Sequence, residues 1–458
     1  MDEVPLPVSQ ASSHLALEPV VAAAVLNRER ERRVSNQKLG ACRSGCDDID
    51  DYVLMGGLER GSVVGLSSER EDEFGLVVKA DCLILLVVQL AVQIIAHSLS
   101  QGVVKRVLVI TPKPATTILP VLRDGIKAEL AATESEWKKT SPANRAAKVR
   151  DALDKVMLSC VFDMDGLWEV LADLDRPDPT PVQKVEEIQD SEDEEDDELE
   201  GEGGADASSA APATEKTAPD MIIITHFSSL LSALFSHRSS TAAHAKLQLL
   251  ASHVRHLSRS LPSNPLILIL NSTNTAVDTS SSSAAAPGPT APPPPSTASY
   301  PSERQRKQLD PTLRSIFHNP QPSASYGEGM TAGAAARRYT VTKPAFGLVF
   351  AQLLDLHLLC TRVPRSRKDS ELLAGVRTAA AAAAPRDRET VEFVTVVEVL
   401  LDEMGVWKGT TDGGEDDDTR KWAWKSREQR WGPVVIESGR VVEAFSGAAS
   451  TKTTNIEP

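Results

Sequence analysis

The chain reads Gly61-Ser-Val-Val-Gly-Leu-Ser-Ser-Glu-Arg-Glu-Asp-Glu-Phe-Gly75 at the place where a nucleotide-binding fold needs a phosphate-binding loop. Such a loop follows a strand with glycines and a Lys-Ser/Thr pair, because backbone N–H groups, one ammonium and one hydroxyl have to meet phosphates and Mg²⁺. Here the β-branched strand leads instead into the carboxylates of Glu69, Glu71, Asp72 and Glu73. Four carboxylates repel a triphosphate, so we predict a nucleotide-binding fold without its usual chemistry.

The sequence on either side of this stretch alternates between strands and helices. A strand at 63–66, a helix at 74–99 and a strand at 106–110 form a β-α-β unit, which implies parallel strands joined by a right-handed crossover. The alternation continues through helices at 143–154, 165–174, 227–235, 242–261 and 346–354, strands at 156–162, 221–225, 266–270, 355–361 and 391–401, and a hairpin at 434–445. We therefore expect an α/β fold with a mostly parallel twisted sheet flanked by helices, a C-terminal antiparallel hairpin and long insertions.

Two composition shifts divide this pattern. Residues 176–219 contain a dense acidic block, and residues 275–339 are rich in Ser, Ala and Pro, so both read as insertions that cannot bury a core. The predicted organisation is an N-terminal helical or flexible segment (1–39), three core parts (40–175, 220–274 and 340–446), the two insertions between them (176–219 and 275–339) and a flexible tail (447–458).

Composition limits the classes of function. The formal charge of −15 argues against a globally basic nucleic-acid surface, so any DNA contact has to be local or borrowed from a partner. Five scattered cysteines are typical of reduced intracellular thiols, and Cys42 and Cys46, although spaced like metal ligands, lack a second pair, so no metal is expected. The apolar run at 82–96 is shorter than the roughly 20 residues of a membrane span. The N-terminal residues lack a secretory signal pattern, which favours a cytosolic or nuclear protein.

Taken in order, these elements resemble the ATPase core of the RecA family, specifically the eukaryotic recombinase paralogues of DNA repair. The segment 45–61, Gly-Cys-Asp-Asp-Ile-Asp-Asp-Tyr-Val-Leu-Met-Gly-Gly-Leu-Glu-Arg-Gly, is similar to the motif that precedes the phosphate-loop strand in that family. Residues 161–171 resemble the family's strand followed by an acidic helix, and 270–275 lie where its strand ends in Thr-Asn-Gln. The resemblance covers roughly residues 40–175, 220–275 and 340–446.

Three departures from the family pattern remove a phosphoryl-transfer site. The phosphate-loop position lacks Lys-Ser/Thr, no carboxylate follows the strand ending at 110, and the strand at 221–225 ends in Thr225-His226 where the family has its Walker B aspartate. We predict a pseudo-ATPase with no catalytic residue and no cofactor, and we do not expect it to bind ATP. The residues of the degenerate nucleotide loop are Gly65, Ser67, Ser68, Glu69 and Gly75, and those of the degenerate Walker B position are Thr225 and His226.

A run of Trp, Lys and Arg at 421–431 is the candidate DNA contact, because such residues stack bases and neutralise phosphates. The candidate residues are Lys421, Trp422, Trp424, Lys425, Arg427 and Arg430. The alternative, which the alternation favours, is an edge strand with the Trp side chains packed inward. A second basic run, 28–33, is interpreted as a solvated helix end.

The resemblance implies a nuclear protein that assists homologous-recombination repair by assembling with other recombinase-family subunits on DNA. No membrane partner is expected. Fold alone does not set function. Two alternatives remain open: a RecA-superfamily ATPase that binds nucleotide through an atypical loop, and an acidic interaction scaffold unrelated to DNA.

Overall fold

A computed structural model provides the structure of the chain. It describes residues 21–69, 85–133, 137, 139–176, 218–278, 313–320, 339–373, 391–409 and 422–445. The positions of Gly75 and Lys421, the beginning of the helix predicted at 74–99 and nearly all of both predicted insertions lie outside these residues.

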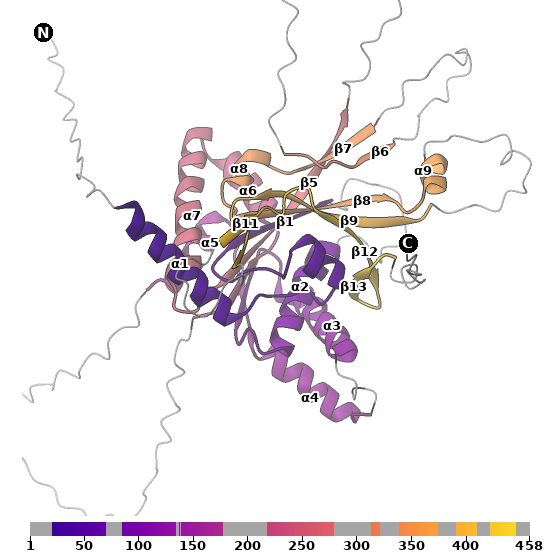
Figure 1. Ribbon diagram of the computed structural model, residues 1–458, viewed down its shortest axis with the longest axis horizontal. Coiled ribbons are helices and arrows are strands. Elements are labelled where there is room, and N and C mark those ends of the chain that lie inside the picture. Colours follow the sequence, from indigo (N-terminus) through magenta and orange to yellow (C-terminus); the bar gives the residue numbers. More distant parts are fainter. Residues whose placement is uncertain are drawn as a thin grey trace, which may run out of the picture.

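An eleven-stranded sheet in the order β13-β12-β9-β8-β1-β5-β4-β2-β3 forms the centre of the molecule, and β6 and β7 extend it from β5 (Figure 1). Six neighbouring strands are parallel: β3 (Val156–Cys160), β2 (Val107–Thr111), β4 (Met221–Ile224), β5 (Leu266–Asp278), β1 (Val63–Glu69) and β8 (Leu356–Pro364). Antiparallel strands follow β8: β9 (Phe393–Asp402), β12 (Trp431–Glu437) and β13 (Arg440–Glu443). The predicted α/β fold, its mostly parallel sheet and its C-terminal hairpin are confirmed.

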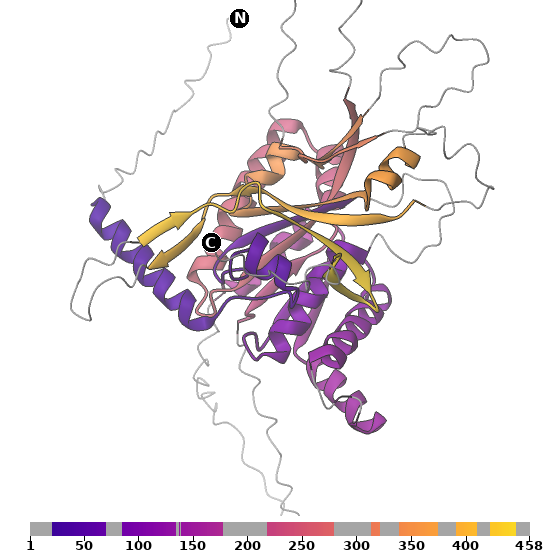
Figure 2. The same cartoon turned by 45° about the vertical axis from the view of Figure 1, so that its right-hand side comes forward.

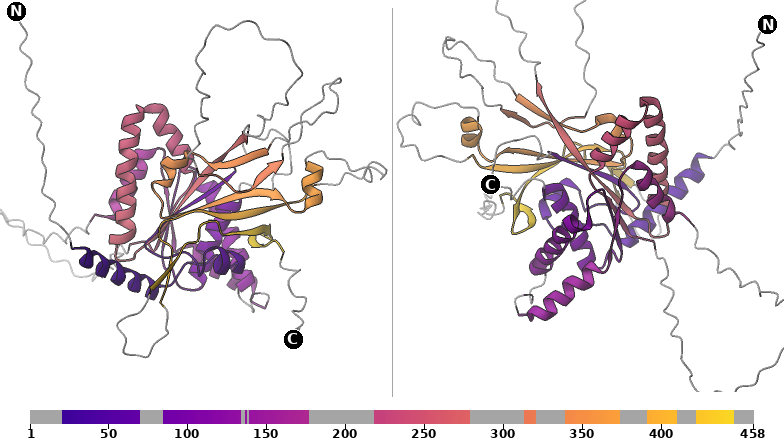
Figure 3. Two further views of the ribbon diagram at one scale, coloured as in Figure 1. Left: turned by 45° about the horizontal axis from the view of Figure 1, so that its top comes forward. Right: turned by 180° about the vertical axis from the view of Figure 1, so that it is seen from behind.

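Helices cover both faces of the sheet (Figure 3). One face carries α2 (Leu85–Ser100), α3 (Ala115–Thr133) and α4 (Pro142–Leu153), together with the π-helical turn η1 (Asp48–Val53). The other face carries α5 (Met164–Leu174), α6 (Phe227–His237), α7 (Ser240–Ser260) and the short α8 (Gly347–Ala351). Because both faces of the central sheet are buried, β2, β4 and the first half of β5 are apolar runs whose residues alternate between two cores. In β5, Leu266 and Leu268 pack toward the α2 side, whereas Ile267 and Ile269 pack toward the α6 side.

Three smaller elements complete the fold. The helix α1 (Ala22–Leu39) lies beside a separate two-stranded ribbon of β10 (Val406–Gly409) and β11 (Trp422–Lys425) (Figure 2). The strands β6 (His318–Pro320) and β7 (Tyr339–Pro344) pair with each other, and α9 (Arg367–Leu373) contacts β8. The basic run at 28–33 therefore lies in the middle of α1, which corrects its interpretation as a helix end.

Two sequence expectations needed further correction. The helix α3 was not predicted, because Pro120 and Gly125 interrupt its pattern. Gly125 is required by close packing, since a Cβ there would lie 2.3 Å from Cγ1 of Val92 on α2. The strand predicted at 266–270 continues to Asp278, because its second half pairs with β7.

The connections between strands define one edge of the sheet as the place for a ligand. The chain leaves β1 toward the α2 side and leaves β4 toward the α6 side. In open α/β sheets, ligands bind outside the carboxyl ends of the strands where connections diverge in this way.

Candidate functional site

The carboxyl ends of β1, β2, β4 and β5 lie at the same edge of the sheet, because these strands are parallel. Their register aligns Glu69 with Thr273 and Ile110 with Ile224. The positions that the sequence assigned to a phosphate loop, a base and a metal ligand are therefore brought to one edge.

Four residues assigned to the degenerate nucleotide loop lie inside β1 instead, namely Gly65, Ser67, Ser68 and Glu69, and the first two face the core. A Cβ on Gly65 would lie 2.3 Å from Cδ1 of Leu354 and 3.0 Å from the ring of Phe350, so this glycine provides space for core packing. Ser67 is fully buried, and its Oγ lies 2.9 Å from Nε2 of His357 on β8. Neither residue can face a phosphate, which corrects that part of the prediction.

The last residues of β1 carry a carboxylate to the edge. Ser68 and Glu69 are half-buried. Burial raises the pKa of the Glu69 carboxyl above its ordinary value, and Arg362 and Thr342 oppose part of that shift. Arg362 is thus close enough to compensate part of the charge of Glu69 at the end of β1.

The ends of β4 and β2 carry hydroxyls and an imidazole. Thr225 is buried and its N–H donates to the carbonyl of Ile110, while His226 takes a left-handed conformation (φ 54°) at the start of α6. Its Nδ1 lies 3.0 Å from Oγ1 of Thr225. After β2, Oγ1 of Thr111 accepts the N–H of Lys113 at 3.1 Å. These groups provide neither the carboxylate that would hold Mg²⁺ nor the one that would activate a water.

His357 is a titratable group inside the sheet, near the amino end of β8 and opposite Gly65 of β1. It is fully buried, its ring packs edge-on against Phe350 at 5.2 Å between centroids, and Nδ1 has no hydrogen-bond partner. Burial lowers the pKa of His357 to about 3. The imidazole is therefore neutral, and its interaction with Ser67 belongs to the core.

The buried imidazole makes stability depend on pH. Because the folded pKa lies below the unfolded value, the unfolded chain binds more protons at acidic pH, so stability is complete above about pH 6.5 and is lost as pH falls toward about pH 3. We expect His357 to remove about 2 kcal/mol from the free energy of unfolding between about pH 8 and about pH 5. Urea denaturation of the wild type and of His357→Gln checks this expectation. Equal pH slopes for the two proteins would contradict it.

The candidate DNA segment does not form one surface. Trp424 is 52% exposed and Lys425 is exposed on β11, but Arg427 is only 2% exposed and makes two hydrogen bonds of 3.0 Å to the carboxylate of Asp402. Arg430 donates to the carbonyl of Tyr52 at 2.7 Å and lies over its ring. The backbone of Trp422 lies in β11. The structure removes Arg427 from the candidate contact and leaves Trp424 and Lys425 as its solvent-facing part.

Cys42 and Cys46, whose spacing in the sequence is that of two metal ligands, are core residues with free thiols. Both are buried, and burial raises the pKa of each thiol to about 11. Within the described ranges, no group of three or more His, Cys, Asp or Glu side chains is arranged to hold a metal ion.

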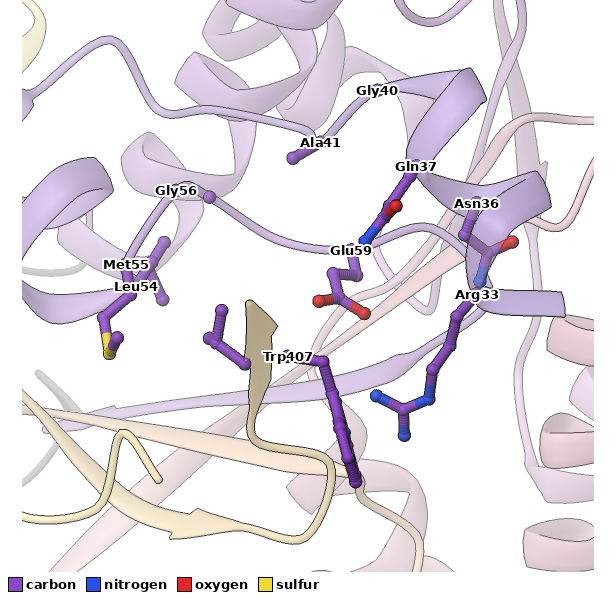
Figure 4. A pocket seen from close by; sticks show the side chains of 12 residues that line it. Arg33, Asn36, Gln37, Gly40, Ala41, Leu54, Met55, Gly56, Glu59 and Trp407 are labelled. Atoms are coloured by element: carbon purple, nitrogen blue, oxygen red, sulfur yellow. The ribbon is translucent and has the colours of Figure 1, made fainter. Parts of the chain in front are cut away.

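A cavity of about 230 Å³ opens between α1, the loop 54–59 and β10 (Figure 4), next to the segment that leads into the amino end of β1. Sequence reasoning missed it, because its walls come from both ends of the chain. The one feature of the sequence that could have indicated this cavity is the glycine pair Gly56-Gly57 inside the segment 45–61.

None of the helices that the structure describes combines the length and the apolar character needed to cross a membrane. No protein-family model and no curated protein matches the chain.

Proposed function

We propose that the chain is a non-catalytic paralogue of the RecA-family recombinases that assembles with other subunits of that family on DNA and assists homologous-recombination repair in the nucleus. One observation carries the non-catalytic part of this proposal. At the shared carboxyl edge, Glu69 stands where phosphate would bind, and Thr111 and Thr225 stand where a base and a metal ligand would be needed. Phosphoryl transfer depends almost entirely on positioning and on cations that neutralise the phosphates, so this edge is poorly suited to it.

The order of the strands supports the link to the family. The resemblance assigns the phosphate loop, the base, the metal ligand and a Thr-Asn strand end to the ends of four strands, and β1, β2, β4 and β5 all end at the same edge. A nucleotide-binding ancestor would require this convergence. The arrangement of these positions supports the proposal, whereas their side chains differ from those that an ATPase needs.

An open strand edge supports the assembly part of the proposal. β3 ends the sheet and pairs only with β2 among the described strands. Met157 in β3 is 38% exposed, and Phe162, just after β3, is 91% exposed. An unpaired edge presents N–H and C=O groups that can accept a strand from another chain, and exposed apolar side chains beside it add specificity.

Mg-ATP is expected to leave the thermal stability of the chain unchanged. A ligand present at about 100 times its Kd would add roughly 2.7 kcal/mol to the free energy of unfolding. The measurement is a thermal unfolding scan of the full chain with and without millimolar Mg-ATP, with Mg-ADP and Mg²⁺ alone as controls. A rise in Tm that requires both nucleotide and Mg²⁺ would favour the alternative of an ATPase with an atypical loop.

Replacing Phe162 by serine is expected to weaken capture of recombinase-family subunits at least about tenfold, because the exposed ring beside β3 would no longer contact the added strand. The free energy of unfolding should change by less than about 0.5 kcal/mol, since the ring faces solvent. Co-purification with the tagged chain, followed by identification of bound subunits, measures the effect. The same variant should fail to restore resistance to double-strand breaks in cells that lack the chain.

The matched control is Leu249→Ser, which removes an exposed apolar side chain (62% exposed) from α7. It should leave both capture and resistance intact. If the wild-type chain captures no recombinase subunit, or if its deletion leaves cells fully resistant to double-strand breaks, the proposal fails and the scaffold alternative gains support.

A further inference from the structure

The cavity beside α1 has the size of a single side chain. Its volume is about 230 Å³. Pockets for cofactors and other small molecules usually enclose roughly 300–1,000 Å³, and a cavity of about 150 Å³ already holds benzene. A nucleotide is therefore too large for it, and one long side chain fits.

One wall of the cavity presents an uncompensated carboxylate. Glu59 is half-buried, and its carboxylate makes no hydrogen bond or ion pair with the described residues. Burial raises the pKa of Glu59, and Arg427, Arg33 and Arg32 oppose the shift only from a distance. Figure 4 shows this carboxylate pointing toward the Trp407 ring.

The neighbouring cations are bound to other groups. Nε of Arg33 donates to Glu29 at 2.8 Å, and its guanidinium lies 4.7 Å from the centre of the Trp407 ring. Arg32 bonds the same Glu29 at 2.8 Å and reaches the carbonyl of Gly61. Asn36, which is 5% exposed, adds a second acceptor, because its Oδ1 has no partner.

The remaining walls combine an aromatic surface with bare backbone. The indole N–H of Trp407 donates to the carbonyl of Met404 at 3.3 Å, and the Arg33 guanidinium already covers one face of the ring, so the opposite face is the part offered to a ligand. Met55, Gly56 and Gly57 have positive φ angles of 59°, 129° and 107°. A Cβ on Gly57 would lie 2.9 Å from the carbonyl oxygen of Cys42, so glycine is needed for the loop to curve around the cavity.

We propose that this cavity binds the guanidinium group of an arginine side chain from a partner protein. A guanidinium has five N–H donors in a planar fork, which matches the carboxylate of Glu59 together with Oδ1 of Asn36, and its plane and charge suit the surface of Trp407. The net charge of −15 favours a basic partner segment. This site is separate from the β3 edge and does not depend on membership of the recombinase family.

The test uses the full chain labelled with 5-fluorotryptophan and the probe N-acetyl-arginine N-methylamide. The ¹⁹F resonance of Trp407, assigned by its loss in Trp407→Phe, should shift saturably with the probe. Glu59→Gln should weaken binding at least about tenfold, equivalent to about 1.4 kcal/mol. The control Glu31→Gln removes the same charge from an exposed position on α1 and should bind as the wild type does.

Two further probes decide between chemistries. The citrulline analogue has nearly the same shape but no charge, and it should not bind. Free arginine should bind no more tightly than the capped probe. The proposal is overturned if no saturable shift appears, if citrulline binds within about threefold of arginine, if folded Glu59→Gln binds like the wild type, or if free arginine binds at least about tenfold more tightly than the capped form.

Discussion

Replacing Asp402 by alanine is expected to lower the free energy of unfolding by about 3–5 kcal/mol, because it leaves the buried guanidinium of Arg427 without a counter-charge. The two side chains are 0% and 2% exposed. Asp402 also accepts the backbone N–H of Arg427 at 2.7 Å and that of Gly405 at 2.9 Å. Burial alone would raise the pKa of Asp402, but the bonds from Arg427 hold it below its ordinary value, so the carboxylate stays ionised.

Urea denaturation of the full chain measures the loss. Glu403→Ala is the matched control, because its side chain is 54% exposed and contacts Arg255 only at 3.8 Å, and it should cost less than about 1 kcal/mol. The double variant Asp402→Leu with Arg427→Met should recover much of the stability, since an apolar pair of similar volume removes the unpaired charge. A loss of less than about 1 kcal/mol in Asp402→Ala would contradict the importance of this ion pair.

Replacing Phe350 by alanine is the second large expected change, with a loss of about 3–5 kcal/mol. The side chain is fully buried on α8. Its ring packs against Gly65, where a side chain would leave no room for it. The ring centroid lies 5.9 Å from that of Phe227 and 5.2 Å from that of His357. Removal of the ring leaves a cavity directly behind β1 that the rigid sheet cannot close.

The control for this variant lies on the same helix. Leu348 is 46% exposed, so Leu348→Ala should lose less than about 1 kcal/mol. Denaturant midpoints at equal m-values compare the two proteins. If both substitutions cost the same, α8 does not anchor β1 in the way the structure implies.

The central strands of the parallel sheet could be predicted because they are buried on both faces. The residues of β4, for example, are all apolar and all buried, and the turn residues that bound such runs are visible in the sequence. Helix ends were less exact: the helix predicted at 165–174 begins at Met164, and its N-cap is Asp163, which accepts the N–H of Gly166. Local patterns determine these elements, so their existence and order follow without a structure.

The candidate sites were less predictable because they depend on residues that are distant in sequence. Arg427 belongs to a basic and aromatic run that is typical of a nucleic-acid contact, and only its partner Asp402, 25 residues away, explains its burial. Ser67 looked like a loop residue until His357, 290 residues away, was found beside it. A pattern of charged residues in the sequence indicates which chemistry is available. It does not indicate which distant side chains will neutralise each charge in the folded protein.

By itself, the sequence determined the α/β class, most of the succession of strands and helices, and the acidic character of the residues at the end of β1 and just after it, because these follow from local periodicity and residue type. Only the tertiary structure decided that β1 lies between β5 and β8, that β3 pairs only with β2 among the described strands, and that Glu59 and Trp407 share a cavity with α1. These features arise from pairings between distant segments, whose free energy comes from packing and hydrogen bonds that exist only once the chain has folded.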